Sequence, residues 1–236
     1  MEMSYEALIG ELKKKTYHPV YFLFGEEPYY IDLITGYIAT HALNEAEKSF
    51  NQTILYGKDS TPQQVIDLAR RFPMMASHQV VVLKEAQELK DFDILEHYFQ
   101  KPQPTTLLVI NYKYKSPDKR KKVFKSLQKN AVTFQSKRLY DNQVPGWISG
   151  FVTNRKYRIE PKAVALVAEY LGSDLSKIAG ELDKLFIAIG EQERNITPLH
   201  VEKYIGISKD YNQFELQNAI GKRDVMKTNR IINYFA

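Results

Sequence analysis

The fold of this chain is decided around one stretch, Arg71-Phe72-Pro73-Met74-Met75-Ala76-Ser77-His78-Gln79-Val80-Val81-Val82-Leu83. Its last residues form a short apolar run rich in β-branched side chains, which predicts a buried strand. Residues 62–70 before it follow an N-cap and carry a first-turn proline, which predicts a helix. Pro73 disfavours helical backbone at the preceding residue. The stretch therefore predicts a helix, an irregular connector and a buried strand in succession.

The same alternation of short strands and helices extends over the first part of the chain. Further strands are predicted at 20–24, 50–55, 105–110 and 131–134, and further helices at 5–15, 29–43, 91–99 and 119–129. Short apolar strands separated by helices are typical of a parallel sheet. We therefore predict an α/β domain over residues 1–139, with a five-stranded, mostly parallel sheet and helices on both faces.

From Tyr140 the pattern changes to helices alone. They are predicted at 144–153, 161–171, 174–189 and 198–205, with no convincing strand between them. This pattern predicts a small all-α domain over residues 140–209. Residues 210–236 begin more helix, whose apolar face has nothing further along the chain to pack against. That face consists of Val225, Ile231, Ile232, Tyr234 and Phe235. We expect the chain to stop at the start of a third, helical domain.

The composition argues against several classes of protein. The absence of cysteine excludes a disulfide framework and thiolate metal sites, and it fits a reducing cytoplasm. The apolar runs are too short to span a bilayer, and residues 1–15 lack the apolar centre of a signal peptide. A net charge of +5 permits weak attraction to a polyanion without requiring it. We expect a cytoplasmic protein that does not contact membranes.

The loop after the first strand argues against a nucleotide site. A phosphate-binding loop reads G-x-x-x-x-G-K-[ST], because glycine lets backbone N–H groups reach phosphate and the lysine and hydroxyl meet phosphate and magnesium. Here the loop is Gly25-Glu26-Glu27-Pro28-Tyr29-Tyr30-Ile31-Asp32, in which tyrosine, isoleucine and aspartate replace the last three signature residues. The histidines lack metal-ligand spacing, and no nucleophile elbow occurs. We therefore expect no cofactor, no metal and no catalytic residue.

Several segments together resemble one known family. They are Val20-Tyr21-Phe22-Leu23-Phe24-Gly25-Glu26-Glu27, Asp118-Lys119-Arg120-Lys121-Lys122-Val123-Phe124-Lys125, Leu171-Gly172-Ser173-Asp174-Leu175 and Glu181-Leu182-Asp183-Lys184-Leu185. In this order they resemble the delta subunit of bacterial DNA polymerase III, which belongs to the sliding-clamp loader. The resemblance covers essentially the whole chain. It implies an AAA+/RecA-like domain without a working nucleotide site, then a small helical domain and a collar domain of which only the start, residues 210–236, is present.

The resemblance also implies a binding site and partners. The family opens the ring-shaped clamp with an apolar pair, usually leucine and phenylalanine, which aligns with Met74 and Met75 beside Phe72 and Pro73. The implied partners are the sliding clamp, primed DNA, and the ATPase and delta prime subunits, which join through the missing collar. No enzymatic activity is expected from the chain alone, only membership of a nucleotidyltransferase complex that replicates DNA.

Alternatives remain open at this point. The two methionines could instead plug the base of the core. A basic group could contact DNA phosphates or form a solvated face; it consists of Lys113, Lys115, Lys119 and Arg120. At the level of the whole protein, the rivals are an ATP-binding AAA+ clamp-loader subunit and a stand-alone DNA-binding module.

Overall fold

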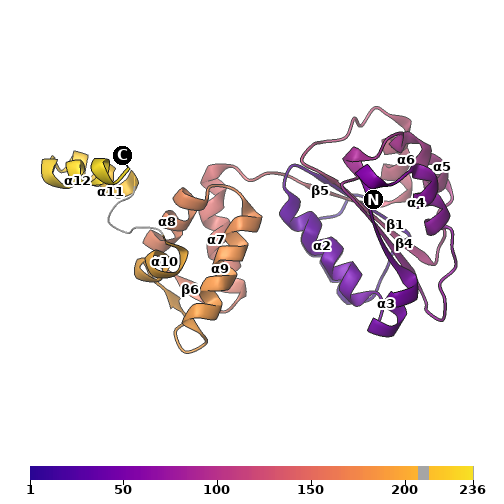
Figure 1. Cartoon of the computed structure of the whole chain (residues 1–236), viewed down its shortest axis with the longest axis horizontal. Coiled ribbons are helices and arrows are strands. Elements are labelled where there is room, and N and C mark those ends of the chain that lie inside the picture. Colours follow the sequence, from indigo (N-terminus) through magenta and orange to yellow (C-terminus); the bar gives the residue numbers. More distant parts are fainter. Residues whose placement is uncertain (207–212, 236) are drawn as a thin grey trace. The chain divides into compact units, whose positions relative to one another are not determined.

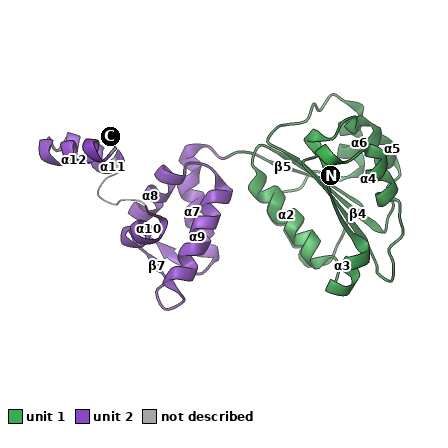
Figure 2. Cartoon of the chain, viewed as in Figure 1, with its two compact units in different colours: residues 1–138 green, residues 139–236 purple. Residues whose placement is uncertain are grey.

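The computed structural model describes residues 1–206 and 213–235 (Figure 1). The chain divides into two compact units, residues 1–138 and residues 139–236 (Figure 2). The predicted boundary between the small helical domain and the collar, at residues 209 and 210, lies outside the described residues. Each unit is described by itself below.

Unit 1 is built on one parallel sheet. Its strands are β1 (Val20–Gly25), β2 (Gln52–Tyr56), β3 (Gln79–Lys84), β4 (Thr106–Lys113) and β5 (Val132–Ser136). They lie in the order β2-β3-β4-β1-β5, and every neighbouring pair is parallel. The predicted five-stranded α/β fold is confirmed. The strand order reverses direction beside β1, and in open parallel sheets such a switch point is where ligands usually bind.

Helices cover both faces of this sheet (Figure 1). They are α1 (Tyr5–Lys13), α2 (Pro28–His41), α3 (Glu45–Asn51), α4 (Pro62–Ala69), α5 (Glu96–Gln100) and α6 (Lys122–Asn130). On β1, Tyr21 and Leu23 face the core beneath α1 and α2. Phe22 and Phe24 face the opposite core beneath α4, α5 and α6. The strand is therefore buried on both sides, which explains its uninterrupted apolar sequence.

Two parts of unit 1 differ from the sequence prediction. Helix α3 was not predicted; Asn44 begins it through a capping box with Glu47, and β2 consequently starts only at Gln52. The basic helix α6 starts later than predicted. Asp118 accepts hydrogen bonds from the backbone N–H and the guanidinium of Arg120, and this local turn competes with helical backbone.

Unit 2 is mainly helical. It contains α7 (Val144–Asn154), α8 (Pro161–Leu171), α9 (Leu175–Ile189), α10 (Pro198–Ile205), α11 (Gln213–Gly221) and α12 (Val225–Phe235). The prediction that no strand interrupts these helices is wrong. The short strands β6 (Arg158–Ile159) and β7 (Asn195–Ile196) form a two-stranded parallel ladder. Two-residue strands are too short to produce a recognisable alternation, so periodicity could not reveal them.

The apolar face predicted for the last helix is only partly open. Ile231 is fully buried, whereas Val225, Ile232 and Tyr234 are exposed. The side chain of Phe235 lies outside the described residues. Within the parts of the chain that the structure describes, no helix combines the length and apolarity needed to cross a membrane.

Candidate functional site

The two ends of the unit 1 sheet carry different candidate sites. Residues 71–78, here called the connector, join α4 to β3 and therefore lie at the edge where the parallel strands begin. The loop between β1 and α2 lies at the opposite edge, where the strands end, together with the last residues of β3 and β4. The first edge carries the candidate clamp-binding residues, and the second is where a nucleotide site would be.

Apolar side chains of the connector point into solvent. Phe72 is 77% exposed, Met74 is 61% exposed and Met75 is 100% exposed, whereas Pro73 is half-buried. This exposure excludes the interpretation that the methionines plug the core. Single exposed apolar residues are ordinary, but three within four residues form a contiguous patch of the kind that marks interaction sites. The side chains of Met74 and Met75 are called the prong below.

The connector is held to the domain at the first prong residue and again after the prong. At the first prong residue, Asn51 at the end of α3 bonds both backbone polar groups of Met74, at 2.9 Å and 2.6 Å. After it, the ring of His78 packs edge-on against Tyr17 with centroids 5.4 Å apart. Burial lowers the pKa of His78, which favours the neutral form of its imidazole. Met75, between these contacts, has left-handed backbone with φ of 53°.

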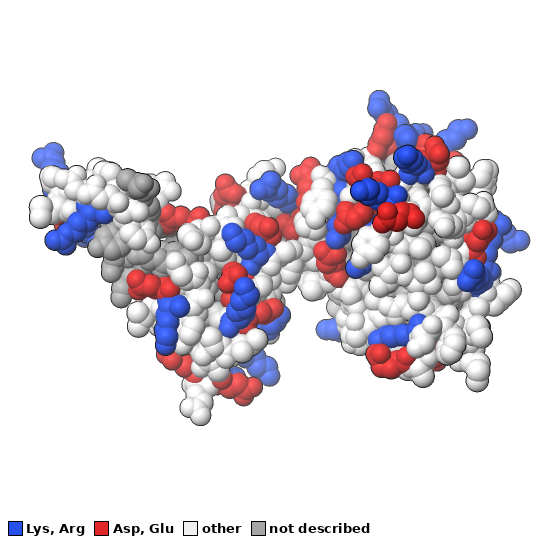
Figure 3. Space-filling model, viewed as in Figure 1, with Lys and Arg blue, Asp and Glu red and all other residues white. Residues whose placement is uncertain are grey.

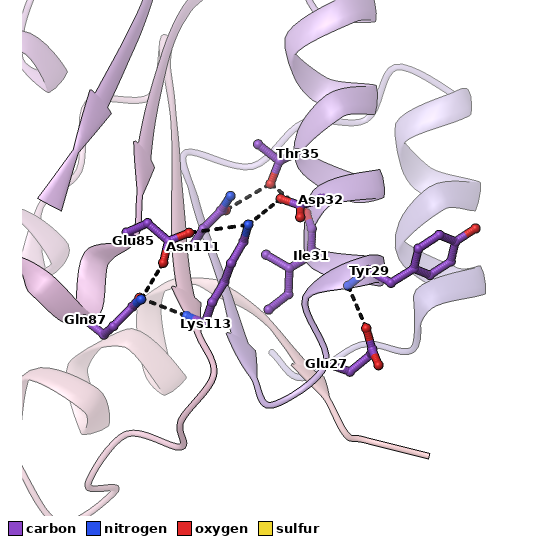
Figure 4. A network of polar contacts seen from close by, with 9 residues as sticks. All are labelled: Glu27, Tyr29, Ile31, Asp32, Thr35, Glu85, Gln87, Asn111 and Lys113. Atoms are coloured by element: carbon purple, nitrogen blue, oxygen red, sulfur yellow. Dashed lines mark hydrogen bonds and ion pairs between the residues drawn. The ribbon is translucent and has the colours of Figure 1, made fainter. Parts of the chain in front are cut away.

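At the opposite edge, the start of α2 is capped by its own chain. The Glu27 carboxylate, which is buried, accepts a hydrogen bond from the backbone N–H of Tyr29 at 2.9 Å (Figure 4). The N-terminus of a helix with free N–H groups is the place where nucleotide phosphates bind in folds of this type. A carboxylate of the protein therefore lies where a phosphate would need to bind.

A buried ammonium group occupies the space between α2 and the ends of β3 and β4. Lys113 Nζ lies 2.7 Å from Asp32 Oδ1 and 3.6 Å from Glu85 Oε1 (Figure 4). Gln87 fixes this arrangement, since it donates to Glu85 and accepts from the backbone N–H of Lys113. Burial by itself would lower the pKa of Lys113. The hydrogen bond and charge of Asp32, helped by Glu85, more than offset burial and raise that pKa.

The structure separates the residues predicted to contact DNA phosphates. Lys113 is buried in the ion pairs just described. Lys115 and Lys119 are exposed, with their amines 3.9 Å from Glu88 and 3.3 Å from the Gln135 side chain. Arg120 pairs with Asp118. On the face seen in Figure 3, basic and acidic side chains lie close together over both units rather than in a single basic patch.

Sequence reasoning missed two of these residues. Asn51 had no recognisable signal, because α3 itself was not predicted and its bonds join positions 23 residues apart. Asp32 was noted only as the wrong residue for a phosphate loop, and its pairing with Lys113 depends on where β4 lies beside β1. Among the described residues, no group of three or more histidine, aspartate or glutamate side chains is placed to hold a metal ion.

Comparisons with known proteins agree on one family. Residues 21–137 match the family model described as DNA polymerase III, delta subunit. DNA polymerase III subunit delta of Bacillus subtilis (strain 168) is 29% identical over 222 residues, covering 90% of this chain and 64% of that protein. This chain therefore spans less than two thirds of the length of that curated relative.

A solved structure extends the match to the fold. The Bacillus subtilis DNA clamp loader delta protein (YqeN) superposes with a TM-score of 0.71 at 26% identity, covering 97% of this chain and 70% of that chain. A mutant of Thermotoga maritima RuvB gives a TM-score of 0.46 at 12% identity, covering 91% and 72%. Over residues 21–137 the chain is therefore similar to the DNA polymerase III delta subunit family, and the curated relative and the first of these structures extend this similarity beyond those residues.

Proposed function

We propose that this chain is a clamp-loader subunit of DNA replication that binds the sliding clamp and opens its ring or holds it open. In this proposal Met74 and Met75 enter an apolar pocket of the clamp, with Phe72 and Pro73 beside them. The chain acts in the bacterial cytoplasm, on primed DNA, together with the ATPase and delta prime subunits of the loader. The observation that carries the proposal is the complete exposure of Met75 on an anchored connector.

The prong has chemistry suited to this role. Thioether side chains are unbranched and adaptable, and proteins use them at surfaces that grip irregular apolar pockets. Burying each methionine in the clamp would contribute about 1.5–3 kcal/mol before the entropy of association is subtracted. Such binding favours an open ring only if the pocket differs between the closed and open clamp, because a ligand shifts an equilibrium by its differential affinity alone.

We also propose that the chain itself hydrolyses no ATP, which argues against the rival AAA+ ATPase function. Two groups of the protein support this. The Glu27 carboxylate caps α2 where phosphates would bind, and the Lys113 ammonium is paired with Asp32, at the position where a phosphate loop has its magnesium-holding hydroxyl. A nucleotide would have to displace both, at the cost of two buried or half-buried charged hydrogen bonds.

The proposal is tested by measuring binding of the cognate sliding clamp by surface plasmon resonance. We expect the double variant Met74→Ala/Met75→Ala to bind the clamp at least tenfold more weakly, because it loses most of the apolar surface of the prong. Met226→Ala is the matched control, since Met226 in α12 is also an exposed methionine, at 70%. It should bind like the unmodified chain. A double variant within twofold of the unmodified affinity would remove the prong from clamp binding.

A further inference from the structure

The prong lies on a loop, and no local sequence feature holds that loop in one conformation. The connector has no regular secondary structure, and Met75 at its tip is fully exposed in left-handed backbone. A short loop that must be ordered during binding loses affinity through the entropy of ordering it. A prong that binds well therefore needs a contact that fixes its backbone before the partner arrives.

Asn51 makes such a contact. Its side-chain Nδ2 donates to the Met74 carbonyl oxygen at 2.9 Å, and its Oδ1 accepts from the Met74 backbone N–H at 2.6 Å. The carboxamide thus satisfies both backbone polar groups of the first prong residue, as a neighbouring strand would. The same Nδ2 also donates to the Glu47 carbonyl oxygen at 3.0 Å, which ties the side chain to its own helix.

The sheet explains why Asn51 lies beside the connector. Asn51 ends α3 and directly precedes Gln52, the first residue of β2. In the β2–β3 pair, Gln52 lies opposite Val80, so the connector enters β3 beside the start of β2. Asn51 is 2% exposed, and water therefore does not compete for its hydrogen bonds. The prong is in this way fixed to the central sheet through a buried side chain.

We propose that Asn51 is a positioning residue for the prong: it holds the Met74 backbone so that Met74 and Met75 are presented to an apolar pocket in one conformation. The expected effect on clamp binding rests on the proposed function, whereas the anchoring of Met74 is a property of the free chain. The competing explanation is that Asn51 only terminates α3, in which case its loss would affect stability and not the prong.

The first measurement needs no clamp. Hydrogen exchange at the Met74 amide, followed by NMR on the whole chain, reports the Met74–Asn51 bond directly. We expect Asn51→Ala to accelerate this exchange at least tenfold. Asn44→Ala is the matched control, because Asn44 caps the other end of α3. It destabilises the same helix but should leave the Met74 amide protected. Equal protection of Met74 in Asn51→Ala and the unmodified chain would overturn the proposal.

The second measurement separates positioning from the prong chemistry. We expect Asn51→Ala to weaken clamp binding at least fivefold in the unmodified chain, and by less than twofold in the Met74→Ala/Met75→Ala background. Asn44→Ala should change clamp binding less than twofold in both. If Asn51→Ala and Asn44→Ala weaken binding equally, the role of Asn51 is only structural. If the double methionine variant binds normally, the proposed function fails, while the exchange result still decides whether Asn51 anchors Met74.

A second variant covers the case in which Asn51→Ala does not fold. Asn51→Asp keeps the side-chain volume and an acceptor for the Met74 N–H, but it has no N–H group for the Met74 carbonyl oxygen. We expect its Met74 amide to stay protected, because the acceptor remains, and its clamp affinity to fall as in Asn51→Ala, because the Met74 carbonyl oxygen is no longer held. A variant that folds and binds the clamp like the unmodified chain would overturn the proposal.

Discussion

At the edge of the unit 1 sheet where the strands end, charged side chains pair with groups of the chain itself. The buried Lys113 ammonium is held by the Asp32 carboxylate at 2.7 Å, and Asp32 stands where a phosphate loop has its hydroxyl residue. Asp32 is half-exposed, whereas the Lys113 side chain is only 9% exposed. The two partners therefore differ in what each would lose if the other were removed.

This asymmetry predicts unequal costs for the two halves of the pair. Asp32→Asn leaves a buried ammonium with only the more distant Glu85, and we expect it to lower the free energy of unfolding by about 1–3 kcal/mol. Lys113→Met fills the same space with an apolar chain and leaves a carboxylate that water can solvate, so it should cost less. Urea denaturation at pH 7 measures both. The exposed Glu45→Gln, which breaks only a surface pair with Lys48, should change stability by less than about 0.5 kcal/mol.

The raised pKa of Lys113 fixes the pH range of this effect. The stabilisation of the folded state by protonated Lys113 is fully present below the ordinary lysine pKa of 10.5. It is lost as the pH rises through the higher pKa that Lys113 has in the folded state. Measurements at neutral pH therefore contain the whole effect.

In the same samples, millimolar ATP should leave the melting temperature of the unmodified chain unchanged, because a ligand raises it only by binding the folded state. A clear rise would favour the ATP-binding rival.

At the scale of elements, β1 and its loop are shaped by packing and not by phosphate binding. Gly25 ends β1 with φ of 137°, and a Cβ at this position would overlap the backbone of Ser136 at the end of β5. The close approach to Ser136, and not a bound phosphate, therefore explains why residue 25 is glycine. Its neighbour Glu27 also donates its backbone N–H to the Ser136 carbonyl oxygen, at 3.4 Å.

This explanation predicts opposite effects at two glycines. Gly25→Ala should lower the free energy of unfolding by about 2 kcal/mol or more, because it adds both a clash and backbone strain. Gly36→Ala, in the exposed middle of α2 with open space around it, should raise it by about 0.5–1 kcal/mol through helix propensity. Thermal or urea unfolding measures both variants. A neutral Gly25→Ala would show that the loop does not depend on this close approach.

At the scale of the whole molecule, unit 1 separates its two candidate sites by the length of its strands. The edge where the strands end is filled by the Glu27 cap and the Lys113 ion pairs. The edge where they begin presents the prong. Under the proposed function, the chain uses the end of the sheet where the strands begin. The DNA contacts proposed for the chain fall to the exposed basic residues Lys115 and Lys119.

The salt dependence of DNA binding tests those basic residues. If Lys115 and Lys119 contact phosphates, Lys115→Gln and Lys119→Gln should each reduce the slope of log affinity against log salt by about 1. Lys113→Met should leave the slope unchanged, because its amine is already bound inside the protein. Fluorescence anisotropy with a primed template measures the slopes. Tight DNA binding without loader subunits, with a steep salt slope, would favour the stand-alone DNA-binding module. If all three variants keep the slope of the unmodified chain, Lys115 and Lys119 do not contact phosphates.

The sequence by itself determined the features that depend on neighbours along the chain. Apolar runs and helix caps predicted the five strands and most helices, because periodicity and capping are local properties. The connector was also predicted, because Pro73 disfavours helical backbone at the residue before it. The sequence did not show which residues contact one another in the folded chain.

Only the tertiary structure decided the contacts that give these residues their roles. Asn51 meets Met74 because β2 pairs with β3, and Lys113 meets Asp32 because β4 pairs with β1. Exposure likewise separated the solvent-facing prong from a core plug, and the buried Lys113 from its exposed basic neighbours. The physical reason is that hydrogen bonds, ion pairs and burial depend on distances in space, and strand pairing brings together residues that no local pattern connects.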